Sequence, residues 1–369
     1  MRGNEKLQNI HRRSTLKILT AAAVPVLLTL LLLAAAAWLP GFTDGLYRDA
    51  SRAVIHVLSR VTGWLPVSVA EVAIGLAVLS LLIALLRLLW VLISGPRRLA
   101  YLLRFVAWML FHAAMLMFLF EAIWGLNYRA QPLAETMGLT VQARSPEELK
   151  TLNRYLIDRA NALAPQLPRQ STGSASPIDF RDVAERVADE FSKTTGRSEA
   201  PVKELLTSKW ISYTRTTGIF IPYTGEANVN SDNTPADLPF VMAHEMSHRY
   251  AIAPEDEANF YAFYILEDAS DPLLSYSAVL SAVLYCQNAL YASDYDAFAE
   301  LYASYSELVR RDLSDYSNHW KQYEGRISEI SETVNNTYLI VQGEPDGVRS
   351  YGRMVDLMLA WYDAQNRVE

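Results

Sequence analysis

The sequence lacks several features that mark common protein classes. It has one cysteine, Cys286, so no disulfide can form within the chain and a cysteine-based zinc site is excluded. It has no block of basic residues, and its net charge of -7 argues against nucleic-acid binding. Cys286 lies in an apolar run and is predicted to be a small buried core residue. The fold therefore requires neither an oxidising nor a reducing compartment.

Long apolar runs are concentrated near the N-terminus. Residues 19–39 form an uncharged run that can cross a hydrocarbon core of about 30 Å. Two more runs, within residues 67–93 and 102–120, predict a second and a third transmembrane helix. The first run is too long for a cleaved signal peptide. Residues 276–292 are also apolar, but polar residues interrupt them, and they predict a buried helix.

The positions of Lys and Arg predict the orientation in the membrane. The N-terminal tail is basic, and the loop between the second and third runs includes Arg97 and Arg104. Both regions should lie in the cytoplasm by the positive-inside rule. The loop at 40–66 has mixed charge. We therefore expect a multi-pass protein of the cell membrane, with a membrane anchor at 1–126 and an extracytoplasmic domain at 127–369.

The second part of the chain has the pattern of a mostly helical domain. Helical periodicity is clear in residues 145–163, 180–194, 294–310, 316–334 and 350–363. Residues 210–230 are instead rich in β-forming side chains and predict a small sheet.

Residues 244–248 read HEMSH, the motif that points most directly to chemistry. On an α-helix His244 and His248 share a face, so both imidazoles can bind one Zn²⁺. Glu245 can then reach a zinc-bound water, whose pKa zinc lowers to roughly 7. Its carboxylate is expected to act as the general base and to pass the proton to a leaving amine. Asp237 is predicted to be the N-cap of this helix.

A catalytic zinc site needs a third protein ligand. Cysteine is excluded and the other four histidines are remote in sequence, so a carboxylate is required. Residues 254–260, PEDEANF, predict a second helix that can offer Glu255 to the metal while Asn259 hydrogen-bonds to a ligand histidine. Glu257 remains open as an alternative ligand. Acidic residues of this kind are also common at helix N-termini for electrostatic reasons.

The pairing of HExxH with E-x-x-A-[D/N] resembles the gluzincin metallopeptidases, some of which are integral-membrane proteases. In that group the first Glu of the second helix is the third zinc ligand, and an Asp four residues later steadies a ligand histidine. The resemblance implies these roles for Glu255 and Asn259. The chain has Asn where the group has Asp, so this position brings a hydrogen bond without a charge.

The wider layout resembles a bacterial membrane family of unknown function that is regarded as a group of zinc peptidases. Besides the three leading runs, the resemblance rests on WGLNYR (124–129), PYTGEANVN (222–230), AHEMSHRYAIAPEDEANF (243–260) and YLIVQGEPDGVRSYGRMVDLML (338–359). It implies a zinc-dependent hydrolase and supplies no substrate.

The PYTGEANVN stretch has two interpretations. In many zinc peptidases an edge strand beside the active helix pairs with an extended peptide substrate. Residues 219–229, with Thr224, Gly225, Glu226 and Asn228, are a candidate for that strand. Alternatively, Glu226 and Asn228 satisfy backbone groups within the fold.

Tyr351 and Arg353 are candidates for stabilising an oxyanion, or for packing and salt bridging. The features together predict a mainly α protein: three N-terminal transmembrane helices followed by a mostly helical, zincin-like metallopeptidase domain with a small β-sheet. We expect one Zn²⁺ per chain, with membrane lipid and a peptide or protein substrate as partners. The alternative is a non-catalytic zinc-binding membrane protein that acts as an interaction or regulatory module. Three spans with few buried polar groups argue against a transporter or channel.

Overall fold

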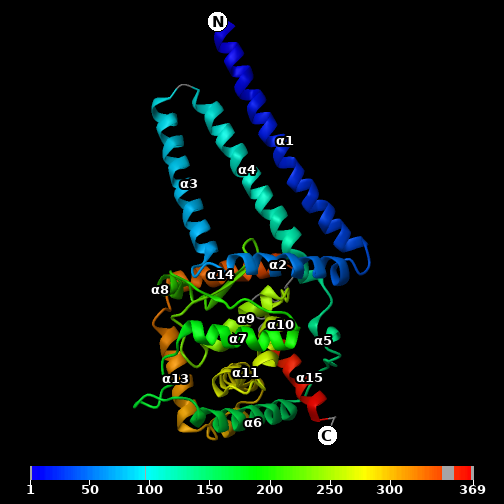
Figure 1. Ribbon diagram of the computed structural model, residues 1–369, viewed down its shortest axis with the longest axis vertical. Helices are drawn as coiled ribbons and strands as arrows, with labels where there is room; N and C mark the ends of the chain where they lie inside the picture. Colours follow the sequence, from blue (N-terminus) through cyan, green and yellow to red (C-terminus); the bar gives the residue numbers. More distant parts are fainter. Residues whose placement is uncertain (1, 96, 343–352, 367–369) are drawn as a thin grey trace.

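Three long helices project from one end of a mostly helical globular part (Figure 1). The computed structural model describes residues 2–95, 97–342 and 353–366. The projecting helices are α1 (Arg2–Trp38), α3 (Val69–Ser94) and α4 (Arg98–Ile123). Ser68 caps α3, because its side chain accepts a hydrogen bond from Glu71 N.

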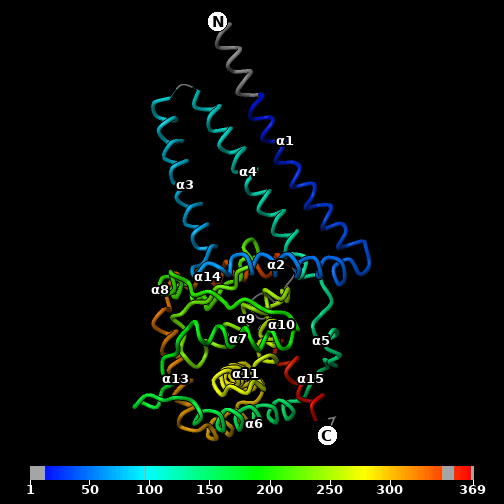
Figure 2. The backbone as a smooth tube through the Cα atoms, viewed as in Figure 1, coloured from blue at the N-terminus to red at the C-terminus, as the bar shows by residue number. Residues whose placement is uncertain are grey.

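Four helices in the described chain are long and apolar enough to cross a membrane. They are Arg13–Trp38 within α1, α3, α4, and α11 (Pro272–Ser293). The most apolar window of α11 is 67% buried in the protein, against 22% or less for the other three. The tube view places α11 in the middle of the globular part (Figure 2). Burial in the protein therefore accounts for the apolar composition of α11, as predicted for residues 276–292.

The segment at 40–66, expected as a loop, is largely helical. A short π-helix, η1 (Thr43–Tyr47), leads into α2 (Arg48–Thr62). α2 lies across the base of the projecting helices (Figure 1). It buries Ser51, Ile55 and Ser59, and Arg52 Nε donates to the Tyr250 carbonyl, 3.0 Å away. This helix could not be predicted from its apolar periodicity, because small and polar side chains form most of its buried face.

The globular part is a stack of helices. Its longer helices are α6 (Pro146–Leu163), α7 (Phe180–Thr195), α9 (Leu238–Arg249), α10 (Glu255–Leu266), α11, α12 (Tyr295–Tyr302), α13 (Glu307–Lys321), α14 (Arg326–Gln342) and α15 (Met354–Asn366). Shorter turns are η2 (Gly125–Arg129), α5 (Leu133–Thr136), η3 (Ala164–Gln166), α8 (Ser208–Ile211) and η4 (Ser212–Thr214). The predicted helices at 145–163 and 180–194 are confirmed.

Two other predicted helices are wrong in their extent. The predicted helix at 294–310 is divided, because the Ser306 side chain accepts from Val309 N and starts α13 there. The predicted helix at 316–334 covers the end of α13 and the start of α14, which are separated around Gly325. Of the predicted helix at 350–363, the first three residues lie outside the described residues and α15 accounts for the remainder.

The predicted β-rich stretch contains two of the three strands of a small sheet. The strands β1 (Lys203–Glu204), β2 (Gly218–Ile221) and β3 (Glu226–Val229) lie in the order β1-β3-β2. β3 runs parallel to β1 and antiparallel to β2, with Ile219 opposite Asn228. β3 is thus the central strand, and each of its four residues is buried.

One continuous hydrophobic core fills the globular part. It joins the inner faces of α6, α7, α9, α10, α11 and α15. Cys286 of α11 is fully buried in it, which confirms its predicted role, and burial raises the pKa of its thiol to about 12. The core thereby holds α9 and α10 against each other.

Candidate metal centre

Helix α9 carries the HEMSH motif in the interior of the protein. Asp237 occupies the N-cap position, but its side chain makes no capping hydrogen bond. Its carboxylate instead accepts from Ser281 Oγ of α11 at 3.4 Å. His244 and His248 lie on the same face, with ring centroids 4.6 Å apart and planes at 85°. Their spacing follows directly from the helical repeat of the sequence.

Helix α10 brings a carboxylate to this pair of imidazoles. Glu255 is the first residue of α10. Its Oε2 lies 3.3 Å from His244 Nε2, and its Oε1 lies 3.6 Å from His248 Nε2. One ligand atom from each of the three residues lies within 4.8 Å of the others. The three side chains thus form a compact set of two nitrogen donors and one carboxylate.

The orientation of His248 is fixed from two sides. Its Nδ1 lies 2.9 Å from the Ile252 carbonyl, which directs Nε2 towards Glu255. Trp124, directly after α4, packs edge-on against the imidazole with centroids 6.0 Å apart. Trp124 Nε1 also donates to the His248 carbonyl at 3.2 Å. His244 Nδ1 is buried and has no hydrogen-bond partner among the described residues.

The electrostatics of the cluster favour an ionised carboxylate beside the imidazoles. Burial alone would raise the pKa of Glu255, but His248 and His244 lower it well below the ordinary range. Burial lowers the pKa of His248, but the Glu255 carboxylate outweighs burial and raises it to about 9. An ionised carboxylate beside two imidazoles is a set of groups suited to a cation.

Glu245 lies beside the ligands and has little room. It is 3% exposed, and its Oε2 is buried with no hydrogen-bond partner in the described part of the chain. Burial raises its pKa to about 7, although both imidazoles lower it in part. A Cβ at Gly218, the first residue of β2, would lie 2.5 Å from Glu245 Oε1. Glycine at this position therefore leaves the space that the Glu245 carboxylate occupies.

The structure separates the two candidate third ligands. Glu257 points away from the imidazoles and accepts from Leu133 N at 2.8 Å. Its neighbours there include Arg48 and Arg52 of α2. Glu255 alone of the two belongs to the cluster. The side-chain direction along α10 decides between them, and the sequence does not show this direction relative to α9.

Asn259 lies beside the centre but makes no bond to a ligand histidine. It is buried and lines the same cavity as His244 and Glu255. His248 Nδ1 pairs with Ile252, and neither His244 Nδ1 nor Asn259 Nδ2 has a hydrogen-bond partner in the described chain. The expected contact between Asn259 and a ligand histidine is therefore not formed.

The residues proposed for a substrate strand serve the fold. β3 has partners on both sides, so its backbone cannot pair with a substrate. Gly225 has φ +66°, and a Cβ there would meet the α2 backbone 2.8 Å away. The Thr224 carbonyl accepts from Thr62 Oγ1 of α2 at 3.2 Å. Asn228 Nδ2 donates to the carbonyl of Glu226 at 3.1 Å. These contacts match the alternative interpretation of the stretch.

Glu226 has a specific structural role. Its two carboxylate oxygens accept from Val69 N at 3.1 Å and Ala70 N at 2.7 Å, at the first turn of α3. Lys203 Nζ of β1 forms an ion pair with it at 2.5 Å, and both side chains are buried. Glu226 therefore anchors the start of α3 to the sheet.

The structure describes one of the two candidates for stabilising an oxyanion. Tyr351 lies outside the described residues. Arg353 Nε lies 3.2 Å from Asp256 Oδ2, and Asp256 does not belong to the cluster of His244, His248 and Glu255. Arg353 is thus tied to α10 by an ion pair, as the salt-bridging alternative expects.

Sequence reasoning missed an aromatic cluster next to the centre. Trp124 packs against Tyr128 and Phe220, with centroids 5.2 Å and 5.7 Å apart. Tyr338 of α14 extends the cluster, with its hydroxyl 3.4 Å from that of Tyr128. The segment 124–129 was noted only as a family motif, because contacts across more than one hundred residues leave no local periodicity.

A family model described as a protein of unknown function (DUF3810) matches residues 43–359. The chain belongs to this family. The match begins at η1 and ends within α15, so the DUF3810 region includes α9 and α10 and leaves all of α1 outside. The expected membership of a family of unknown function is confirmed. No curated protein and no solved structure matches the chain.

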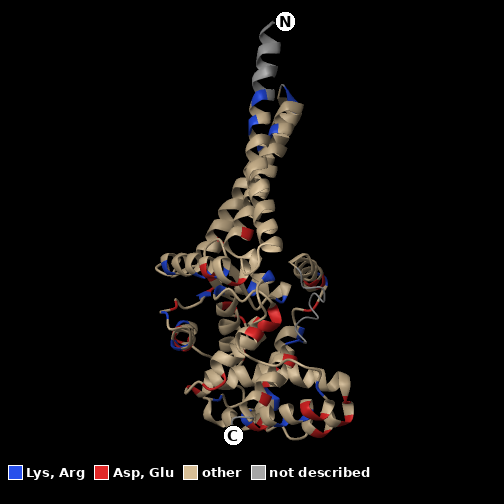
Figure 3. Cartoon of the chain, turned by 90° about the vertical axis from the view of Figure 1, so that its right-hand side faces the viewer, with Lys and Arg blue, Asp and Glu red and all other residues tan. Residues whose placement is uncertain are grey.

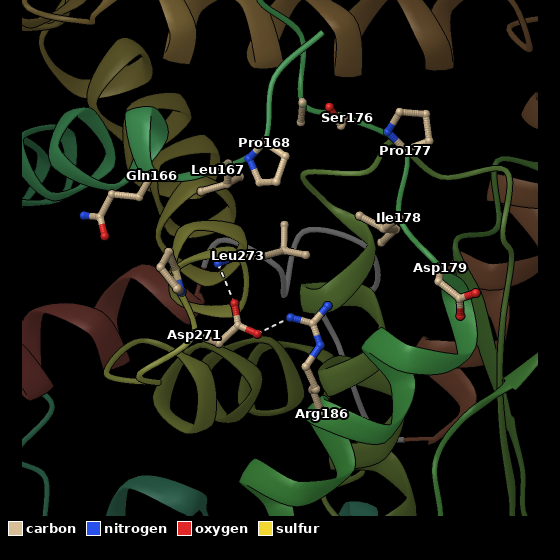
Figure 4. A pocket seen from close by; sticks show the side chains of 12 residues that line it. Gln166, Leu167, Pro168, Ser176, Pro177, Ile178, Asp179, Arg186, Asp271 and Leu273 are labelled. Atoms are coloured by element: carbon tan, nitrogen blue, oxygen red, sulfur yellow. Dashed lines mark hydrogen bonds and ion pairs between the residues drawn. The ribbon is translucent and has the colours of Figure 1, made fainter.

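Two cavities differ in what they offer a ligand. A cavity of about 300 Å³ adjoins the metal-ligand cluster and is lined by residues that include His244, Glu255, Asn259, Asp237 and Tyr316. Another, of about 220 Å³, lies where the start of α7 approaches α11 (Figure 4). There Asp271 pairs with Arg186 and also caps α11 through Leu273 N, so the polar groups that Figure 4 joins are already engaged. The cavity beside His244 and Glu255 is therefore the better candidate for a substrate.

Proposed function

We propose that this chain is a membrane-bound zinc metallopeptidase. The observation that carries the proposal is the convergence of His244, His248 and Glu255 from two helices, with the buried carboxylate of Glu245 beside them. Two imidazoles and one carboxylate are a known donor set for catalytic zinc, which keeps a fourth position open. A purely structural zinc site would close that position and would need no free carboxylate.

The residues present fit zinc on chemical grounds. His244 and His248 present Nε2, and the hydrogen bond at His248 Nδ1 fixes that ring for ligation. When bound, Zn²⁺ supplies Lewis-acid chemistry, since it lowers the pKa of water to about 7 and polarises carbonyl groups. His244, His248 and Glu255 would hold it.

Glu245 is suited to move the proton. Its pKa of about 7 lies close to neutral pH, where a general base both accepts and releases a proton readily. Its Oε2, which no described residue engages in a hydrogen bond, can accept a proton from the attacking water. The same atom can then deliver that proton to the leaving amine nitrogen of the peptide.

The sheet offers a place for an extended peptide. β2 pairs with β3 on one side only in the described sheet, and its first residue, Gly218, lies against Glu245. A peptide added along the free edge of β2 would place its backbone beside the centre. Within the candidate stretch 219–229, β2 rather than β3 is therefore the strand that can pair with a substrate.

The membrane location is part of the proposal. We infer that α1, α3 and α4 cross the membrane, because each is apolar and little buried by the protein, whereas α11 is not. Lys and Arg mark the ends of these helices that lie far from the globular part (Figure 3). The mixed charge of 40–66 does not oppose this orientation, since Arg52 donates to Tyr250 and Arg48 to Gln131 of the globular part. The N-terminus would then be cytoplasmic and the globular part extracytoplasmic.

Metal analysis and a peptidase assay test the catalytic proposal together. Purified wild-type chain should hold one zinc and hydrolyse peptides, whereas Glu245→Gln should hold zinc and lose hydrolysis. The amide cannot accept the proton, a step that typically contributes about 10²–10⁴-fold. Glu329→Gln, an exposed change on α14, is the matched control. Full activity in Glu245→Gln would refute the proposed role, and zinc binding without any hydrolysis by wild type would favour the regulatory alternative.

Reporter fusions test the orientation separately. A reporter placed after residue 130 should be active only on the outer side, and one placed near Arg97 only in the cytoplasm. A cytoplasmic signal from the fusion after residue 130 would reverse the orientation without affecting the metal assignment.

A further inference from the structure

Helix α2 exposes an apolar stripe on the face away from its buried side chains. Val54, Val57 and Val61 follow one another at helical spacing and are all exposed. The buried side of the helix carries Ser51, Ile55 and Ser59, of which only Ile55 is apolar. The arrangement is therefore partly reversed relative to a helix that covers a water-soluble protein, where the valines would face the core.

Helix α14 has the same reversed character. Ile327, Ile330, Val334 and Val341 form one stripe at intervals of three, four and seven residues, and each is more than half exposed. The buried residues of α14 are Ser328 and Leu339, on another face. Two separate helices therefore leave β-branched stripes without a partner among the described residues.

Both stripes lie where the projecting helices leave the globular part. Figure 1 shows α2 and α14 at the same level, at the base of α3 and α4. Tyr338, on the stripe face of α14, contacts Phe120 in the last turns of α4, with centroids 6.4 Å apart. On α2, Ser51 Oγ donates to the Ile123 carbonyl at the end of α4. The stripes are thus continuous with the surface where the apolar helices begin.

Three exposed tryptophans accompany these helices. Trp38 and Trp64 flank α2 in the chain, Trp210 lies on α8 at the level of α14 (Figure 1), and each is at least 79% exposed. Tryptophan gathers at membrane–water interfaces, where its ring is apolar and its N–H stays hydrated. The exposed tryptophans therefore indicate that the same surface meets a membrane–water interface.

We propose that α2 and α14 lie in the membrane surface, with their apolar stripes at the boundary between lipid headgroups and acyl chains. Helices that lie in this plane bury apolar side chains about 5–10 Å deep and keep polar ones in water. The lipid surface is the occupant, because the same surface is continuous with the three apolar helices. The proposal rests on the membrane location proposed above and does not depend on catalysis.

Site-specific fluorescence quenching of the full chain in lipid nanodiscs tests whether α2 and α14 lie in the membrane surface. Val57→Cys and Ile330→Cys place a label on each stripe, and Glu329→Cys and Asp49→Cys are matched exposed controls on the same helices. Cys286 is fully buried, so it should not react in the folded protein. Brominated lipids should quench the stripe labels several-fold more than the control labels, and aqueous iodide should show the opposite order.

A label at Leu82, in the exposed middle of α3, separates the possible failures. If lipid quenches the Leu82 label but not the stripe labels, the seating of α2 and α14 is refuted and the membrane location stands. If lipid quenches none of them, the membrane location itself fails. Stripe labels that are protected from both quenchers and cross-link between chains would show a second copy as the occupant, which also overturns the proposal.

Discussion

Replacing Glu226 by glutamine should strongly lower the stability of the folded protein without affecting hydrolysis. The change removes the negative charge that Lys203 Nζ and the first two N–H groups of α3 share. Glutamine keeps one acceptor oxygen, but the lysine ammonium would then face only neutral carbonyls, including those of Thr62 and Val67 at 2.7 Å and 2.9 Å, and would have no counter-charge. Leaving one partner of a buried ion pair uncompensated typically costs about 3–5 kcal/mol. For a globular part of this size, that loss lowers the unfolding temperature by roughly 6–20 °C.

Thermal unfolding of the purified full chain in nanodiscs measures this effect. Glu204→Gln, at an exposed position on β1, is the matched control and should change stability very little. Adding Lys203→Met to Glu226→Gln should recover part of the loss, because neither buried charge then lacks a partner. If Glu226→Gln kept its stability and instead lost hydrolysis, Glu226 would be a substrate residue and the structural role argued here would be wrong.

Three further changes test the centre and its surroundings. Glu255→Ala should weaken zinc binding by more than the roughly 10–100-fold that is typical for loss of a residue hydrogen-bonded to a metal ligand, whereas Glu257→Ala should keep zinc. Metal titration of both variants measures this, and the reverse order would overturn the ligand assignment. Gly218→Ala should keep zinc but lower hydrolysis about 100-fold, since its Cβ displaces the Glu245 carboxylate; unchanged kinetics would show that the carboxylate has room. Burial raises the pKa of Asp237 to about 7, so the folded state binds this proton more tightly than the unfolded state. The free energy of unfolding should therefore fall by up to about 4 kcal/mol as pH rises from 4 to 7. Unfolding experiments on Asp237→Asn should lack this contribution to the pH dependence.

The parts of the site that follow from one helix could be predicted from the sequence. The spacing of His244 and His248 fixes their common face, whatever surrounds them. The choice between Glu255 and Glu257 could not be made in this way, because it depends on how α10 is rotated against α9. Gly218 was missed for a similar reason, since its meaning lies in a contact with a side chain on another element.

The fold was predictable where apolar residues face a protein core. The helices α6 and α7 show this pattern, and their predicted bounds agree with the structure to within one residue. Helix α2 was taken for a loop, because its valines face outward and its buried face is partly polar. The periodicity of a sequence shows which residues share a face, but it does not say whether that face meets protein or lipid.

The hydrogen bond from Trp124 to the His248 carbonyl has a consequence for substrate choice. In the proposed membrane peptidase, it joins the end of α4 to the last turn of the helix that carries His244 and His248, so the protein would fix the distance of the centre from the bilayer. A substrate that is itself anchored in the membrane would then reach the centre only with a bond at that distance. Sequence around the cut would then matter less than the number of residues between the cut and the substrate's own membrane anchor.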